Sequence, residues 1–161
     1  MRHLRLTVEY DGTDFAGWQR QAPEHRTVQA VLEDALARMT GAKTILRGAG
    51  RTDAGVHARA QVAGFQTEST IPLAGIERGL NAALPADVAI VAVDEVAAEF
   101  DARRSARGKH YVYRLWNRAA RSPLHARTSW HVLRPLDVEV MRRAAAALLG
   151  EHDFSAFRAA G

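Results

Sequence analysis

The sequence predicts an α+β fold of the ferredoxin-like type, with a mainly antiparallel sheet and the element order strand, helix, strand, strand, helix, strand. Three observations predict this fold. Residues 3–10 alternate polar and apolar side chains as a strand does, residues 28–39 repeat apolar side chains at helical spacing, and residues 87–96 are rich in β-branched side chains. The remaining elements fall between these three segments.

The first strand and the first helix have the clearest patterns. In HLRLTVEY (3–10), Leu4, Leu6 and Val8 share one face. After a long polar loop, Thr27 is suited to cap a helix that ends before Gly41. The apolar positions of this helix lie on one face at i, i+3, i+4 spacing and are Val28, Val31, Leu32, Ala35, Leu36 and Met39.

Two strands and a second helix follow. Residues 43–49 and 56–66 are predicted as strands, and the link between them is rich in glycine. Pro72 is placed to open a helix that runs to about Ala83, with Leu73, Ile76 and Leu80 facing inward. The buried strand at 87–96 completes a ferredoxin-like domain over residues 1–105.

Residues 106–161 are predicted to be the first part of a second, similar domain. A strand is expected over 109–117, and a helix over about 135–149 that stops at Gly150. No further strands follow to complete a second half of a sheet. The last third therefore either lies on the first domain or belongs to a longer protein.

The composition narrows the class of protein. The chain has 161 residues, of which 47% are hydrophobic and 25% charged, as in a soluble globular protein. It has no cysteine, which excludes disulfides, thiol catalysis and iron–sulfur clusters. No apolar run approaches the length of a membrane span, so we expect a cytoplasmic protein with no membrane partner.

Positive charge is concentrated between Asp101 and Arg134, where Asp101 is the only acid. Tyrosines and tryptophans alternate with the arginines there, and this mixture suits RNA, whose phosphates need cations and whose unstacked bases need flat rings. The alternative is that the aromatic side chains are core and that the arginine excess reflects genome composition. The candidate RNA contacts are Arg103, Arg104, Arg107, Arg114 and Arg118.

Several other kinds of binding or catalytic site are not indicated, because the sequence lacks their motifs. There is no phosphate-binding G-x-x-x-x-G-K-[ST] loop, and Asp53 stands where a dinucleotide fingerprint needs its third glycine. No H-E-x-x-H pair occurs, and His125 and His131 have no carboxylate ligand beside them, so we expect no metal site. The RRM signature is also absent.

The stretch GAGRTDAGVHARAQV (48–62) contains the strongest candidate for catalysis, Asp53. Asp53 has two interpretations: a turn residue that caps backbone N–H groups, or a carboxylate kept ionised by the guanidinium of Arg51. Gly50 and Gly55 let the backbone approach a ligand. A carboxylate of the second kind suits chemistry at a sugar C1′, although glycosidases usually require two carboxylates.

Six motifs resemble, in order and spacing, the TruA family of tRNA pseudouridine synthases. The resemblance covers essentially the whole chain, and GRTDAGVHA is highly specific. The motifs are EYDGTDFAGWQRQ (9–21), TVQAVLEDAL (27–36), GAGRTDAGVHARAQVAGF (48–65), LNAALPADVAI (80–90), FDARRSARGKHYVYRLWN (100–117) and LLGEHDFSAFR (148–158).

The resemblance implies an isomerisation without cofactor, in which the N1–C1′ bond of a uridine breaks and C5 is joined to C1′. Asp53 matches the catalytic aspartate, which either attacks C1′ or removes a proton to form a glycal intermediate. Arg51 matches the arginine that assists base flipping, and Tyr111 matches the tyrosine that stacks on the flipped base. Tyr111 is expected to share a strand face with Tyr113.

Three further expectations follow from the resemblance. The partner is tRNA, modified at positions 38, 39 and 40 of the anticodon stem-loop, and the protein is expected to be a homodimer. Family members continue well past residue 161 through a second half that completes the catalytic sheet. Asp11 and Asp14 are interpreted as turn residues, and Trp18 as packing.

Two alternatives to an RNA-modifying isomerase remain open from the sequence. One is a truncated, catalytically inactive tRNA-binding module of the same fold. The other is a glycoside hydrolase that uses Asp53, which requires a second essential carboxylate.

Overall fold

The computed structural model describes residues 1–157 and divides into two units, Met1–His110 and Tyr111–Gly161. Arg158, which ends the last sequence motif, lies outside the described residues. The elements of the first unit are β1 (Arg2–Tyr10), α1 (Val28–Thr40), β2 (Arg47–Gly48), β3 (Ala58–Thr67), α2 (Leu73–Ala83) and β4 (Val88–Glu95).

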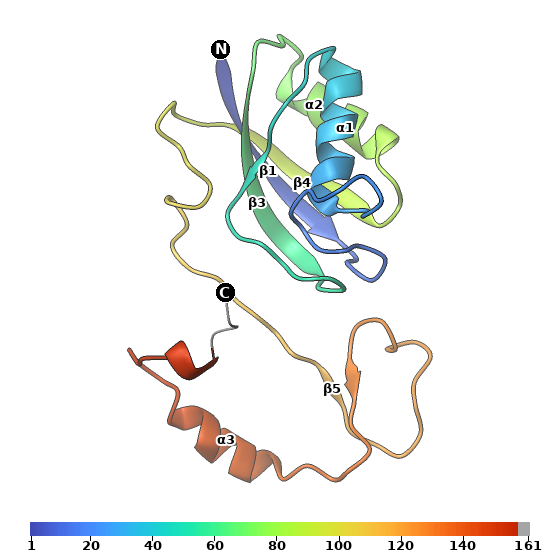
Figure 1. The fold of residues 1–161 in the computed structure, drawn as a ribbon, viewed down its shortest axis with the longest axis vertical. Helices are drawn as coiled ribbons and strands as arrows, with labels where there is room; N and C mark the ends of the chain where they lie inside the picture. Colours follow the sequence, from blue (N-terminus) through green and yellow to red (C-terminus); the bar gives the residue numbers. More distant parts are fainter. Residues whose placement is uncertain (158–161) are drawn as a thin grey trace. The chain divides into compact units, whose positions relative to one another are not determined.

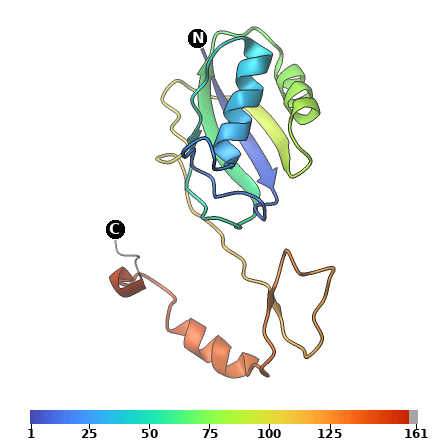
Figure 2. The same ribbon diagram turned by 45° about the vertical axis from the view of Figure 1, so that its right-hand side comes forward.

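The first unit has the predicted ferredoxin-like topology. Its strands lie in the order β2-β3-β1-β4, and each neighbouring pair is antiparallel. In the central strand, Leu6 pairs with Ala63 of β3 on one side and with Val93 of β4 on the other. Figures 1 and 2 show that α1 and α2 lie on the same face of this sheet.

The core lies between the sheet and these two helices. The face of β1 predicted to be buried is buried, since Leu4, Leu6 and Val8 are at most 1% exposed. From the helices, Leu32 and Ile76 are fully buried against it. Apolar periodicity therefore identified the correct faces of both helices and of β1.

Both ends of α1 are capped as the sequence indicates. The Thr27 hydroxyl oxygen accepts a hydrogen bond from the Ala30 amide at 3.3 Å. Gly41 adopts the left-handed conformation (φ 70°), and its amide donates to the Ala37 carbonyl at 3.0 Å. This conformation is unfavourable for residues with a Cβ, which explains why the helix ends at a glycine.

The strand predicted over 43–49 is wrong for most of its length. Only Arg47 and Gly48 join the sheet, where they pair with Gly64 and Ala63. The preceding residue, Leu46, has its amide and carbonyl bonded to side chains of α1 instead. These backbone groups are therefore not available to a strand ladder.

The segment after β4 crosses the sheet face opposite the helices. Gly64 points to that face because its neighbours Ala63 and Phe65 are buried in the core. A Cβ placed on Gly64 would lie 3.3 Å from the Phe100 ring, which shows how closely this segment packs. The segment continues to Lys109, beside Gly50.

The second unit contains β5 (Leu115–Trp116), β6 (Trp130–His131), α3 (Val138–Ala146) and a 3₁₀ turn at Ser155–Phe157. The strand predicted over 109–117 is wrong except for β5, which pairs in parallel with β6. Strand geometry requires a backbone partner, and within residues 111–157 only this two-residue pairing supplies one. The predicted shared strand face of Tyr111 and Tyr113 is therefore wrong too.

Helix α3 is shorter than the predicted 135–149. It begins at Val138 because the Asp137 carboxylate caps it, accepting from the amides of Glu139 and Val140 at 3.0 and 2.9 Å. It ends at Ala146, after which the Leu148 and Leu149 amides bond three residues back instead of four. None of the helices within residues 1–157 combines the length and apolar character needed to cross a membrane.

Candidate active site

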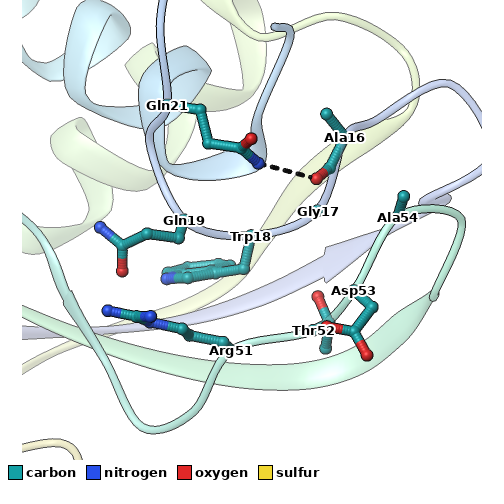
Figure 3. A pocket seen from close by; sticks show the side chains of 9 residues that line it. All are labelled: Ala16, Gly17, Trp18, Gln19, Gln21, Arg51, Thr52, Asp53 and Ala54. Atoms are coloured by element: carbon teal, nitrogen blue, oxygen red, sulfur yellow. Dashed lines mark hydrogen bonds between the residues drawn. The ribbon is translucent and has the colours of Figure 1, made fainter. Parts of the chain in front are cut away.

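Two loops of the first unit meet at the ends of β1 and β3. The loop after β1 and the loop before β3 are joined by backbone hydrogen bonds, from the Trp18 amide to the Thr52 carbonyl at 2.9 Å and from the Gly55 amide to the Phe15 carbonyl at 3.3 Å. Between them lies a pocket of about 280 Å³ (Figure 3). Its lining residues are Ala16, Gly17, Trp18, Gln19, Gln21, Arg51, Thr52, Asp53 and Ala54.

Glycines permit this close approach of the two loops. A Cβ on Gly12 would lie 2.0 Å from the Val56 carbonyl oxygen, a distance that no side chain can adopt. Gly17 has φ 111°, and a Cβ there would lie 2.8 Å from the Thr52 carbonyl oxygen. The glycines of the first motif are therefore required by backbone packing against the second.

The start of helix α1 supports the first loop. The amides of Val28 and Gln29, which have no partner inside the helix, donate to the carbonyls of Gly17 and Trp18 at 3.2 and 3.0 Å. The Trp18 side chain is 1% exposed and packs beside Gly48. The packing role predicted for Trp18 is confirmed.

Two polar side chains of α1, Gln29 and Glu33, connect the loop after β1 to the segment that leads into β2. Gln29 accepts from the Arg20 amide at 2.9 Å and donates to the Leu46 carbonyl at 3.1 Å. Glu33, which is buried, accepts from the Leu46 amide at 3.0 Å and from Arg20 Nε at 2.6 Å. These side chains thus hold the loop after β1 and the segment that leads into β2.

The Arg20 side chain adds an ionic contact at the surface. Its Nη2 donates to the Asp34 carboxylate at 2.7 Å. Hydrogen bonding to Asp34, followed by hydrogen bonding to Glu33, raises the pKa of Arg20 above its ordinary value against the opposing effect of burial. Arg20 therefore remains a cation that fixes the outer part of the loop to α1.

The loop that contains Asp53 is held from the sheet side. The Tyr10 hydroxyl lies 2.8 Å from the Thr52 hydroxyl oxygen, and Gln61 Nε2 donates to the Gly50 carbonyl at 2.8 Å. The Val56 amide closes a turn onto the Asp53 carbonyl at 3.2 Å. Hydrogen bonds therefore hold the loop 50–56 both before and after Asp53.

The Asp53 side chain itself is exposed, and it forms no hydrogen bond or ion pair with any residue in the described range 1–157. Asp53 therefore begins a turn, but its side chain caps no backbone amide within residues 1–157. Among the nine residues that line the pocket in this part of the chain, Asp53 is the one carboxylate. A glycoside hydrolase that needs a second carboxylate finds no support in this lining.

Arg51 is near Asp53 in sequence, but its guanidinium extends in another direction. Figure 3 shows Arg51 extending toward Gln19 and Trp18, away from the Asp53 carboxylate. Within the described residues, the Arg51 guanidinium forms no ion pair. The intervening Thr52 is bonded to Tyr10 and Trp18, which holds the backbone from which the two charged side chains extend in different directions.

The other predicted site residues divide between the two units. Arg103, Arg104 and Arg107 belong to the first unit and are exposed. Tyr111, which is 60% exposed, begins the second unit. The remaining candidates, Arg114 and Arg118, lie in the second unit and are exposed.

Three candidate arginines have local contacts, two through their backbone amides and one through its guanidinium. The Arg103 and Arg104 amides donate to the Asp101 carboxylate at 3.0 and 2.8 Å, and these bonds, that from Arg104 first, lower the pKa of Asp101. The Arg118 guanidinium lies 4.4 Å from the Trp116 ring centroid. Such stacking leaves a guanidinium free to meet phosphate at its edge.

Asp11 is a turn residue, as predicted. Its carboxylate accepts from the amide and the hydroxyl of Thr13 at 3.0 and 2.6 Å. His57 Nδ1 lies 3.0 Å from the same carboxylate and accepts from the Gly12 amide at 3.2 Å. His57 thus joins the two loops once more.

Sequence reasoning missed the residues that position the site: Tyr10, Gln29, Glu33 and His57. One signal was available for two of them. Gln29 and Glu33 are spaced i, i+4 on α1 beside its apolar face, which predicts adjacent polar side chains close to the core. Within residues 1–157 no three acidic or histidine side chains are clustered in a way that could hold a metal ion.

Comparison with known proteins agrees with this fold. The sequence model of the tRNA pseudouridine synthase family matches residues 6–103, which include both loops of the pocket. Proteins named tRNA pseudouridine synthase A are 56% identical over 160 residues in Myxococcus xanthus and 54% identical over 159 residues in Geobacter sp. strain M21. Both alignments cover 99% of this chain, but 60% and 64% of those relatives.

An antiparallel sheet in the order β2-β3-β1-β4 with two helices on one face defines an α+β protein of the ferredoxin-like type. Within that class, the chain belongs to the tRNA pseudouridine synthase family. It spans between 60% and 64% of the length of the two relatives named above.

Proposed function

We propose that this protein isomerises uridine to pseudouridine in tRNA and that Asp53 is the catalytic carboxylate. The observation that carries the proposal is the Asp53 side chain, which is exposed at a pocket and has no partner within residues 1–157, on a loop whose backbone is bonded on both sides. A reacting group needs this combination of a fixed backbone and a free functional atom. The family of the chain supports the same reaction.

The reaction balances without a cofactor. The N1–C1′ bond breaks, C5 bonds to C1′, the hydrogen on C5 leaves as a proton and N1 of the base gains one. Because charge develops at the sugar when the glycosidic bond breaks, an ionised carboxylate stabilises that state. Asp53 performs this role, either by attack on C1′ or by removing a proton to form a glycal intermediate.

Arg51 and Tyr111 are proposed to act on the RNA bases. A uridine inside a stem must leave the stack before C1′ and C5 can be reached, at a cost of about a few kcal/mol. Arg51, which points away from Asp53 in Figure 3, is free to occupy the space that the base leaves. Tyr111 is proposed to stack on the flipped base, as the family motif implies.

We further propose that the target uridines lie in the anticodon stem-loop at positions 38 to 40 and that the active protein is a homodimer. The exposed arginines at 103, 104, 107, 114 and 118 are proposed to contact the tRNA backbone, since guanidinium groups bind phosphate well. Light scattering of the purified protein measures the oligomeric state, and a monomer at assay concentrations would contradict the dimer.

Tritium release tests the proposed reaction. The substrate is tRNA labelled with tritium at uridine C5, because forming the C5–C1′ bond expels that hydrogen. We expect release by the parent protein, none by Asp53→Asn, and tRNA affinity within several-fold for the two proteins. Glu68→Gln is the matched control, since Glu68 is an exposed carboxylate that follows the end of β3 away from the pocket.

The possible results have distinct meanings. Equal release from the parent and Asp53→Asn would overturn the assignment of Asp53. Release by neither protein, with tRNA still bound, would indicate a tRNA-binding module without catalysis.

A further inference from the structure

Lys109 lies against the loop that contains Arg51 and Asp53. A Cβ built on Gly50 would be 2.6 Å from Lys109 Nζ and 3.0 Å from its Cε, so the end of the lysine side chain occupies the space beside this glycine. Gly50 directly precedes Arg51. The ammonium group is thus brought next to the site from a segment distant in sequence.

The Lys109 ammonium has no hydrogen bond or ion pair with any of residues 1–157. Its side chain is exposed, and neither of the neighbouring charged groups, Arg51 and Asp53, pairs with it or with the other. Arg51 and Asp53 line the pocket and Lys109 lies beside the adjacent Gly50, and none of the three charges neutralises another. The net charge of these three groups is positive, which attracts an anion.

We propose that Lys109 binds a backbone phosphate of the RNA next to the nucleotide that enters the pocket. The proposal rests on the proposed function for the identity of the RNA. A lysine is suited to this role because its ammonium is a compact charge on a flexible stem, which follows a phosphate as the backbone distorts. A phosphate beside Gly50 also meets no side chain from that residue, because glycine has none.

Chemical labelling of amines tests the location directly. The chain has two lysines, Lys43 and Lys109, so mass spectrometry resolves each one. Lys43 is exposed and follows the far end of α1, a helix of 13 residues and about 20 Å whose first residues support the pocket. We expect an anticodon-arm RNA to protect Lys109 from an amine-reactive ester by at least about fivefold and to leave Lys43 unchanged.

Substitutions test the energetic role. Lys109→Gln should weaken binding of the same RNA about 5- to 10-fold at low salt and reduce the slope of log K against log salt by about 1. Lys109→Arg should retain affinity within about threefold, since the charge remains. Lys43→Gln is the matched control and should change neither quantity.

Gly50→Ala displaces Lys109 without removing it. The added methyl group meets the flexible end of a side chain, not backbone, so the loop is expected to fold normally while the ammonium moves. We expect weaker RNA binding in the same direction as Lys109→Gln and no further loss when the two substitutions are combined. Thermal unfolding of each variant checks that the fold is intact.

These outcomes separate the phosphate contact from the proposed reaction, because the labelling and RNA-binding measurements need no turnover and tritium release is read beside them. Unchanged affinity and salt slope in Lys109→Gln, or equal protection of both lysines, would overturn the phosphate contact. A loss of tritium release in Lys109→Gln at unchanged affinity would also overturn it, since it would assign Lys109 to the chemistry. Phosphate binding with no tritium release from the parent would overturn only the proposed reaction.

Discussion

The Tyr10 hydroxyl lies 2.8 Å from the hydroxyl oxygen of Thr52, the residue between Arg51 and Asp53. Tyr10 is the last residue of β1 and is 3% exposed, so its ring is fixed by the core. The bond joins the centre of the sheet to the middle of the loop. The position of the loop is therefore set by the core as well as by the loop after β1.

Tyr10→Phe should loosen the loop without unfolding the protein. The ring remains to fill the core, and the loss of one hydrogen bond lowers the free energy of unfolding by about 0.5–1.5 kcal/mol. We expect the single-turnover rate of tritium release to fall more than tRNA affinity does. Rapid-quench kinetics and a binding titration on the same preparation measure the two effects.

Thr52→Val completes a double-mutant cycle with Tyr10→Phe. It removes the other hydroxyl of the same pair at similar volume, and the double variant should lose little more than either single variant. Additive losses would show that the two hydroxyls act independently.

Glu33→Leu should loosen two segments at once, the loop after β1 and the segment that leads into β2. The substitution leaves the buried Leu46 amide without its acceptor and Arg20 Nε without its buried partner, at a cost of about 1–3 kcal/mol. We expect faster amide hydrogen exchange at residues 18–20 and 46–53, because both segments are held through this carboxylate. Exchange measured by mass spectrometry on pepsin fragments gives this result without any activity assay.

Two further variants serve as controls for the exchange measurement. Glu33→Gln keeps an oxygen for the Leu46 amide and should behave more like the parent than Glu33→Leu does. Asp34→Asn removes only an exposed partner of Arg20 and should leave exchange unchanged. If Glu33→Leu were folded and its amide hydrogens exchanged as fast as those of the parent, Glu33 would have no part in holding these two segments.

The fold of the first unit was largely predictable because its elements bury one apolar face each. Periodicity of 2 in β1 and of 3.6 in α1 identifies such faces directly, and the caps at Thr27 and Gly41 mark the helix ends. The second unit was predicted less well. None of its described residues is buried, and its predicted strand and helix are both shorter than their sequence patterns indicate.

The site was predictable only in part. The motif around Asp53 was identified, but the direction of each side chain depends on bonds between segments far apart in sequence, such as Tyr10 with Thr52. For the same reason, the sequence indicated a guanidinium near Asp53 but not the direction in which Arg51 extends. Spacing along the chain does not reveal that Thr52 is held from both sides.

Asp87 should make stability depend on pH. Arg26 donates to both of its carboxylate oxygens, at 2.7 and 2.9 Å, and this hydrogen bonding is the main reason that the pKa of Asp87 lies below its ordinary value of 3.8. A carboxylate with a lowered pKa in the folded state stabilises the fold fully above its unfolded pKa, and this contribution is lost as pH falls through the folded value.

Asp87→Asn should therefore lower the free energy of unfolding at pH 7, by at most about 1 kcal/mol because the pair is partly exposed. The difference from the parent should shrink below about pH 4, where the parent carboxylate also becomes protonated. Urea denaturation followed by circular dichroism at pH 7 and pH 3 measures both values. In an Arg26→Met background, Asp87→Asn should have little further effect at either pH, because the cation responsible for the shift is gone. If the free energies of unfolding of the parent and Asp87→Asn differed by the same amount at both pH values, Asp87 would stabilise the fold through its shape and not through its charge.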